Sequence, residues 1–275
     1  MNELSKQRRS QVVAALVEGN SIRATCRMTG VCKKAVLKLL VDLGNVCAQY
    51  QDRTIRNLSC KRVQCDEIFS FCYAKDKNLP EELKGKFGFG SIWTWTALCP
   101  DSKLMISWLV GERSVPYAVK FMSDVASRLA HRVQLTTDGH KPYLRAVDTA
   151  FGCDVDFAML EKIYAGPPRE DATRYSPAEC CGTRTHRIMG NPDPEHISTS
   201  FVERQNLTMR MHMRRFTRLT NAFSKKVDNH RHAIALHYMH YNFARIHQTL
   251  RVTPAMQAGV ADHVWSVEEI VGLLD

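Results

Sequence analysis

Apolar residues recur at helical spacing in the first part of the chain. The pattern predicts one helix between residues 6 and 18 and another from about residue 32. Ser21 can cap a short helix between them, and Gly30 permits a tight turn after it. Because two helices joined by a glycine-containing turn are typical of a helix-turn-helix, we expect an all-α unit over residues 1–58.

A different pattern covers the middle of the chain, where apolar residues occur in short runs or alternate with polar ones. Strands and helices are predicted at 61–73, 89–98, 103–110, 116–130, 133–137, 143–151 and 155–164. The first three elements are strands, and helix, strand, helix and strand follow. This is the order of the ribonuclease H-like fold, an α/β class with a mixed sheet and helices. Trp93 and Trp95 alternate onto one face of the second strand and are expected in the core.

The pattern breaks over residues 166–195. Five of the ten prolines lie there, which predicts a long loop. Helical spacing resumes at about 198–216 and again at 229–245. We therefore expect a ribonuclease H-like domain over residues 59–251, with the long loop inside it and a C-terminal acidic tail over 252–275.

Charge is distributed in blocks along the chain. The 275 residues carry a net charge of +10. The net charge is +8 over residues 1–62, −3 over 63–203, +9 over 204–251 and −4 over 252–275. Two basic blocks on either side of a slightly acidic centre favour a polyanionic partner, most simply nucleic acid. The alternative is a basic surface that is merely solvated.

The helix from about residue 32 is the candidate recognition helix. Lys33, Lys34 and Lys38 occupy its early polar positions, from which they can reach phosphates or base edges in a major groove. A basic three-helix bundle that binds another protein is the alternative.

Three acidic residues are candidates for catalysis. Asp66 lies inside the first predicted strand, Asp138 at the carboxyl end of the fourth, and Glu203 on the helix after the loop. Adjacent strand ends and a covering helix can bring such side chains together, and three carboxylates can bind two Mg²⁺ ions about 3.5–4 Å apart. Simpler explanations exist, since Asp-Gly is a common turn and Ser200 with Glu203 resembles a capping box. Glu67 is expected to point to the opposite face of the sheet from Asp66.

Several segments, in the same order along the chain, resemble insertion-sequence-one type transposases. They are CDEIFSF at 65–71, IWTWTA at 92–97, GERS at 111–114, TDG at 137–139, FVERQNLTMR at 201–210 and FSK at 223–225. The resemblance covers roughly residues 60–230. Members of this family often carry a cysteine zinc motif before the helix-turn-helix, whereas the first cysteine here is Cys26.

The resemblance implies that Asp66, Asp138 and Glu203 form a DDE triad. Such a triad binds Mg²⁺ or Mn²⁺, and two ions are expected. It also implies that Arg210, two helical turns after Glu203, contacts DNA at the transposon end.

Three neighbours of Arg210 are further candidates for DNA binding. Asn206 lies between Glu203 and Arg210 on the same helical face, and Arg214 and Arg215 extend the basic segment.

The expected function is therefore that of a DDE transposase, which cleaves DNA at transposon ends and joins them to target DNA. Its partners would be double-stranded DNA, as terminal inverted repeats and as target, and a second copy of the chain or more. One alternative is a ribonuclease H-like nuclease that cuts without joining. Another is a catalytically idle DNA-binding repressor derived from a transposase.

No apolar run approaches the roughly 20 residues that a membrane-spanning helix needs. The first residues also lack the apolar core of a signal peptide. We therefore expect no membrane association and a cytoplasmic, nucleoid-associated protein.

Overall fold

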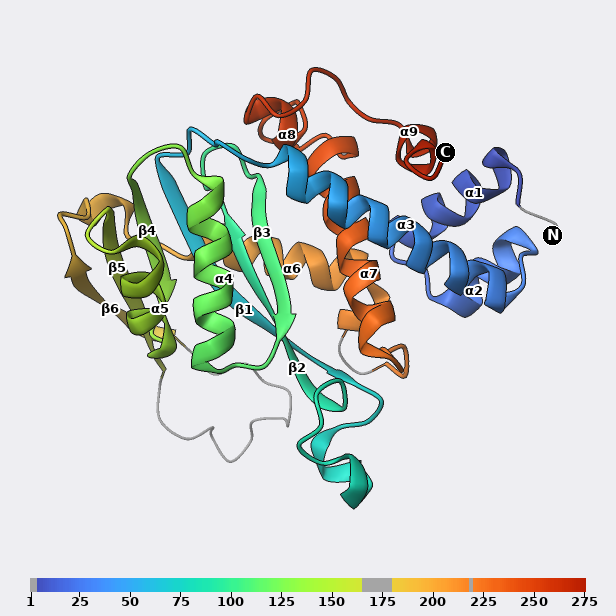
Figure 1. The fold of residues 1–275 in the computed structure, drawn as a ribbon, viewed down its shortest axis with the longest axis horizontal. Coiled ribbons are helices and arrows are strands. Elements are labelled where there is room, and N and C mark those ends of the chain that lie inside the picture. The colour runs from blue at the N-terminus through green and yellow to red at the C-terminus, as the bar shows by residue number, and fades with distance from the viewer. Residues whose placement is uncertain (1–3, 165–179, 218–219) are drawn as a thin grey trace.

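A six-stranded mixed sheet lies at the centre of the computed structural model, which describes residues 4–164, 180–217 and 220–275 (Figure 1). The strands are β1 (Arg62–Cys72), β2 (Gly90–Leu98), β3 (Met105–Gly111), β4 (Val133–Asp138), β5 (Val155–Tyr164) and β6 (Cys180–Met189). Their order in the sheet is β3-β2-β1-β4-β5-β6. β1 and β5 each run parallel to β4, whereas the β1–β2, β2–β3 and β5–β6 pairs are antiparallel. This mixed α/β architecture is compatible with the predicted ribonuclease H-like fold.

Helices pack on both faces of this sheet. α4 (Val115–Arg128) and α5 (Pro142–Phe151) lie in front of it in Figure 1, and α6 (Ser200–His212) lies behind it. Successive side chains of a strand point to opposite faces of the sheet, so they pack against different helices. Trp95 is fully buried beside Phe121 of α4 and Tyr143 of α5, as expected of a core residue. Trp93 is only half-buried.

The N-terminal region forms three helices, as the sequence pattern predicts. They are α1 (Lys6–Val17), α2 (Ile22–Thr29) and α3 (Lys33–Thr54). The Ser21 hydroxyl accepts a hydrogen bond from the amide of Ala24 and so caps α2. Gly30 ends α2 with a φ of 68°, a left-handed conformation that favours glycine.

The third helix extends from this unit to the rest of the molecule. α3 packs along α7 (Val227–Met239), and the amide of Gln51 donates to the carbonyl of Ala235 at 3.0 Å. The two helices approach so closely at Gly44 that a β-carbon there would lie 2.5 Å from His232. The N-terminal helices are therefore held against α7 in the C-terminal part of the chain.

The prediction of a loop over residues 166–195 is wrong for residues 180–189. These form β6, an edge strand paired antiparallel with β5. Almost all of its side chains are exposed, so it lacks the apolar alternation that identifies a strand in sequence. The five prolines of the segment all lie outside β6. Residues 165–179 of the predicted loop lie outside the described residues.

The C-terminal segment folds back onto the N-terminal helices. After α7 the chain continues as a π-helical turn (His240–Ala244), then α8 (Pro254–Gln257) and α9 (Val267–Gly272). α9 packs against α1, and the Asp275 carboxylate accepts a hydrogen bond from Arg9 at 3.4 Å. The C-terminal segment over residues 252–275, predicted as an acidic tail, is therefore packed against the N-terminal helices.

Short 3₁₀ segments complete the chain at Asp76–Asn78, Glu81–Leu83, Pro194–His196 and Arg214–Phe216. Within the described ranges, no helix has the length and apolar character needed to cross a membrane.

Candidate active site

Asp66 and Asp138 come together because of the register between two parallel strands. β1 pairs with β4 as far as Cys65 opposite Thr137, so the next residue of each strand is an aspartate at the end of the shared ladder. The Asp66 carboxylate accepts hydrogen bonds from the Asn206 side chain at 2.9 Å and from the Glu67 amide at 2.8 Å. Asp138 accepts one from the amide of His140 at 3.1 Å.

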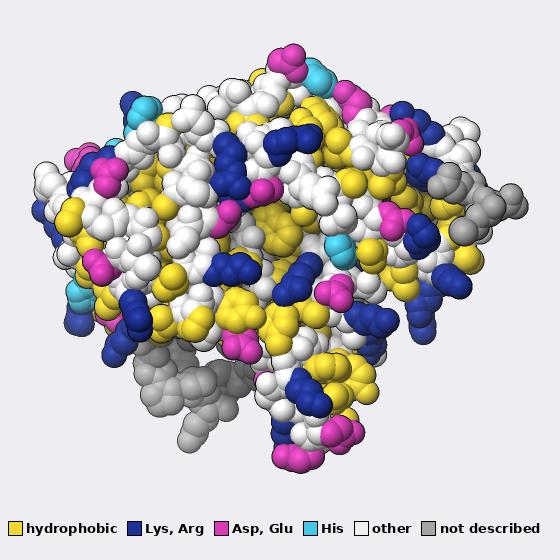
Figure 2. All heavy atoms as spheres, in the orientation of Figure 1, with side chains coloured by type: hydrophobic (Ala, Val, Ile, Leu, Met, Phe, Trp, Pro, Cys, Tyr) yellow, Lys and Arg dark blue, Asp and Glu magenta, His cyan; other side chains and the backbone are white. Residues whose placement is uncertain are grey.

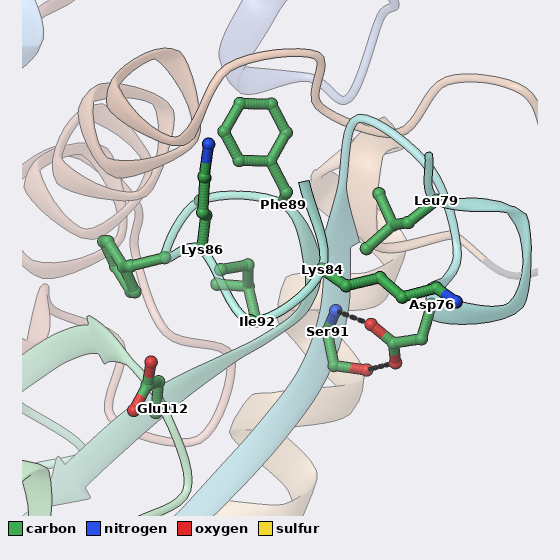
Figure 3. Close-up of a pocket in the computed structure, with 11 residues that line it drawn as sticks. Asp76, Leu79, Lys84, Lys86, Phe89, Ser91, Ile92 and Glu112 are labelled. Carbon is green, nitrogen blue, oxygen red and sulfur yellow. Dashed lines mark hydrogen bonds between the residues drawn. The ribbon is translucent and has the colours of Figure 1, made fainter. Parts of the chain in front are cut away.

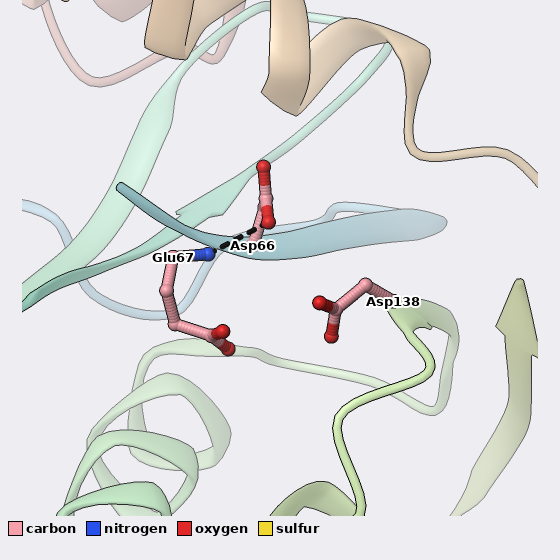
Figure 4. Close-up of side chains that lie close together, drawn as sticks. All are labelled: Asp66, Glu67 and Asp138. Carbon is pink, nitrogen blue, oxygen red and sulfur yellow. Dashed lines mark hydrogen bonds between the residues drawn. The ribbon is translucent and has the colours of Figure 1, made fainter. Parts of the chain in front are cut away.

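Glu67 is an acid of this site that the sequence analysis did not identify. As predicted by alternation, Glu67 and Asp66 leave β1 on opposite sides, and the Asp138 carboxylate lies on the Glu67 side (Figure 4). One carboxylate oxygen from each of the three residues lies within 4.8 Å of the others. The Glu67 side chain is 1% exposed, and it lies beside the buried hydroxyl of Tyr143.

Glu203 lines the same pocket but lies outside this group of three. α6 carries it over the sheet, and its carboxylate accepts a hydrogen bond from the Thr199 hydroxyl at 2.6 Å. It also forms an ion pair with Lys162 of β5. The pocket has a volume of about 750 Å³ and is lined by Asp66, Asp138 and Glu203 together. The three predicted acids therefore share one cavity.

Basic side chains surround the carboxylates. Arg113, in the loop after β3, donates to Glu67 at 2.9 Å and to Asp138 at 3.3 Å. Lys141 and Lys162 line the same pocket. Arg113 belongs to the GERS segment, but its contacts depend on the pairing of β3, β2 and β1, which periodicity does not give.

Burial and mutual repulsion disfavour the ionised carboxylates in this pocket. Burial, reinforced by the nearby charges of Asp138 and Glu203, raises the pKa of Asp66 to about 7. Burial and Asp138 raise the pKa of Glu67 to about 8, and burial also raises the pKa of Asp138. A cation would offset this repulsion. Carboxylate oxygens are the donors that Mg²⁺ and Mn²⁺ prefer, so the residues fit a divalent ion.

Asn206 is mostly buried and makes its contacts inside the protein. Its side chain is 6% exposed, and its amide is used by Asp66 at 2.9 Å. The Thr96 hydroxyl donates to the backbone carbonyl of Asp66 at 2.9 Å and lies 3.4 Å from Asn206 Oδ1. Asn206 therefore orients the carboxylate of Asp66, a role that helical spacing alone did not indicate. Its contact with DNA stays a prediction.

The predicted arginine contacts have different environments. Arg215 donates to the Ser224 hydroxyl at 3.0 Å and to the carbonyl of Asn229 at 2.9 Å. Burial lowers the pKa of Arg215 to about 10. The contact of Arg215 with DNA stays a prediction. Arg214 is exposed and Arg210 is half-buried.

The predicted lysine contacts are exposed at the far end of the molecule. Lys33 and Lys34 begin α3, and Lys38 follows one turn later, where it pairs with Asp42. In Figure 1 the α2–α3 corner and strands β4 and β5 lie at opposite ends of the molecule. Lys and Arg side chains are scattered over the α1–α3 end in the space-filling view (Figure 2).

A second pocket is formed by the segment between β1 and β2. Its two acids do not converge: Asp76 accepts a hydrogen bond from the amide of Ser91 at 2.8 Å, and Glu112 lies on the opposite side of the pocket (Figure 3). The acid pocket described above is therefore the stronger candidate for catalysis.

Comparison with known proteins gives two distant structural similarities. No protein-family model and no curated protein sequence matches the chain. It is similar to the crystal structure of the Mos1 strand transfer complex, with 15% identity and a TM-score of 0.25 over 57% of this chain and 59% of that one. It is also similar to the cryo-EM structure of a piggyBac transposase synaptic complex with hairpin DNA, with 11% identity and a TM-score of 0.39. That similarity covers 100% of this chain and 72% of the other.

The chain thus spans 59% of the length of the Mos1 chain that it matches. At these identities and TM-scores, a function has to be inferred from the site itself.

Proposed function

We propose that the chain is a DDE transposase that cleaves DNA at the ends of a mobile element and joins those ends to target DNA. The observation that carries this proposal is the position of Asp66 and Asp138 where the ladder between the parallel strands β1 and β4 ends, with Glu203 of α6 in the same pocket. A ribonuclease H-like catalytic domain of the insertion-sequence-one type fits the strand order and the residues that carry the resemblance.

Asp66, Asp138 and Glu203 would hold two Mg²⁺ or Mn²⁺ ions in this proposal. When bound, such ions activate the attacking oxygen and stabilise the leaving oxygen of a phosphodiester. The protein's own contribution is orientation. Asn206 fixes one oxygen of Asp66, and Thr199 fixes one oxygen of Glu203.

The basic residues of the pocket fit a phosphate backbone. Arg113 and Lys162 now neutralise Glu67, Asp138 and Glu203. Because both side chains lie at the carboxylates, they would also be placed to contact DNA phosphates beside the scissile bond.

The N-terminal helices fit a separate DNA-binding role. Lys33 and Lys34 are exposed on the first turn of α3, the candidate recognition helix, and would contact the terminal inverted repeats. Because an element has two ends, pairing them requires at least a homodimer on DNA.

The decisive experiment uses DNA from both flanks of the gene, incubated with the protein and Mg²⁺, with Asp138→Asn as the control. We expect nicks at the element ends and joined products, both absent with the variant. Cleavage without joined products would favour the ribonuclease H-like nuclease. Binding without cleavage would favour the idle repressor.

A further inference from the structure

Strand β1 continues well beyond the acid pocket. β4 accompanies it only to Cys65, whereas β1 runs on to Cys72 paired with β2. Residues 223–225 lie along the edge that β4 leaves open. There Ser224 pairs with Cys72, and its carbonyl accepts a hydrogen bond from the Tyr73 amide at 2.8 Å.

The two faces of this extension differ sharply. On one face, the Ser70 and Ser224 hydroxyls bind the buried ring of His230 at 3.2 and 2.8 Å. The other face carries what we name the aromatic row, which consists of Phe69, Phe71, Trp93 and Phe223. Phe69 is 43% exposed, and the other three rings are half-buried.

The aromatic row is built from paired rings. The centroids of Phe69 and Trp93 lie 5.3 Å apart, and those of Phe71 and Phe223 lie 4.7 Å apart. Cross-strand pairing of Phe69 with Trp93 fixes the first pair. The rings are therefore held in place by the sheet, so little conformational entropy is lost when a flat ligand stacks on them.

Cationic groups are interleaved with these rings. The Arg113 guanidinium carbon lies 4.8 Å from the centroid of Trp93, and the Lys225 ammonium lies 3.6 Å from that of Phe223. Lys75 lies 5.9 Å from the centroid of Phe71. Aromatic rings that stack bases, beside cations that neutralise the backbone, are the combination that binds single-stranded nucleic acid.

Arg113 connects the aromatic row to the acid pocket. The same guanidinium that lies over Trp93 donates to Glu67 and to Asp138. A strand with a phosphodiester at the carboxylates would therefore meet the rings immediately beyond Arg113.

We propose that the aromatic row binds unpaired bases of the DNA strand that enters the acid pocket. The inference rests on the proposed function and specifies its substrate as a DNA end with unpaired nucleotides. A base released from its partner can stack on an exposed ring, whereas a paired base inside the duplex cannot.

The test compares two DNA ligands by fluorescence anisotropy in EDTA, so that no cleavage occurs. One is a blunt duplex, and the other is the same duplex with a six-nucleotide unpaired thymidine tail. The wild type is expected to bind the tailed duplex more tightly. Phe69→Ala and Phe69→Leu should each lose about tenfold in affinity for the tailed duplex, and the blunt duplex should bind as before.

Leu207→Ala is the matched control, because Leu207 is 45% exposed on α6 and lies outside the row. Thermal unfolding establishes that each variant folds. Equal losses on both ligands, or no loss on the tailed one, would overturn the proposal. Because binding is measured without a divalent ion, tail binding through the row would stand even if a separate assay showed no DNA cleavage.

Discussion

The acid pocket and the basic α2–α3 corner are the two regions that the sequence marks for function, and they are built in opposite ways. In the pocket, Asp66, Glu67 and Glu203 each accept a specific hydrogen bond or ion pair from a neighbour. At the corner, Lys33 and Lys34 are exposed on one helical turn. The proposed catalysis in the pocket would therefore depend on the geometry of each side chain. The proposed DNA binding at the corner would depend on the sum of the charges.

The largest expected effect follows from removing a carboxylate of the pocket. Asp66→Asn or Asp138→Asn keeps the shape of the side chain but weakens its hold on a cation. We expect cleavage of element-end DNA to fall by at least roughly a thousandfold. Affinity for DNA, measured by anisotropy, should stay within about twofold because the basic residues are unchanged. Full cleavage activity in Asp138→Asn would show that cleavage does not depend on this carboxylate, contrary to the proposed role of the acid pocket.

A smaller loss is expected at Glu67. Glu67→Gln removes the charge that fixes Arg113 and, through it, Asp138. Since changes to groups that orient metal ligands typically cost 10–100-fold, we expect a loss of about that size in the cleavage rate. Glu161→Gln is the matched control, because Glu161 is a glutamate that lines the acid pocket but is exposed, whereas Glu67 is buried beside it. Similar rates for both variants would show that burial of Glu67 has no bearing on activity.

The fold was largely predictable from the sequence, and the exceptions have a physical reason. β1 to β5, α4 and α5 are confirmed within a few residues, because each buries an apolar face that leaves a periodic pattern. β6 leaves no such pattern, since its side chains are exposed and its stability comes from backbone pairing with β5.

The candidate site was predictable from the sequence only where a residue's position within one strand was informative. Asp66 was identified as an acid inside a predicted strand, and Asp138 as an acid at the carboxyl end of another. Glu67 and Arg113 meet through the register of three strands, and Lys162 reaches Glu203 across the pocket. These contacts join distant parts of the chain, and no local pattern encodes them.

The acid pocket should also make stability depend on pH. The pKa of Asp66 rises from 3.8 to about 7 on folding, so the native state holds a proton that the unfolded state releases. The free energy of unfolding in EDTA should therefore decrease as pH rises from about 4 to 7, by up to about 1.4 kcal/mol per pH unit for one proton. Urea unfolding at several pH values measures this. Asp66→Asn should flatten the dependence, and an unchanged slope would contradict it.

The smallest effect is expected at the α2–α3 corner. Lys33→Ala with Lys34→Ala should weaken DNA binding several-fold and reduce the slope of log affinity against log salt by about 2. Anisotropy between 50 and 200 mM salt measures both quantities, because the Debye length falls about twofold over this range. Lys38→Ala, which removes a lysine already paired with Asp42, should have a weaker effect. Unchanged affinity in the double variant would place DNA recognition elsewhere.

The central claim is that Asp66, Asp138 and Glu203 form one divalent-cation site. Titration of Mn²⁺ by electron paramagnetic resonance, with DNA present, tests it most directly by counting the ions bound to each chain. We expect bound Mn²⁺ in the wild type and markedly weaker binding in Asp66→Asn, Asp138→Asn and Glu203→Gln, each shown by circular dichroism to be folded. Equal Mn²⁺ binding by the wild type and all three variants would contradict the account.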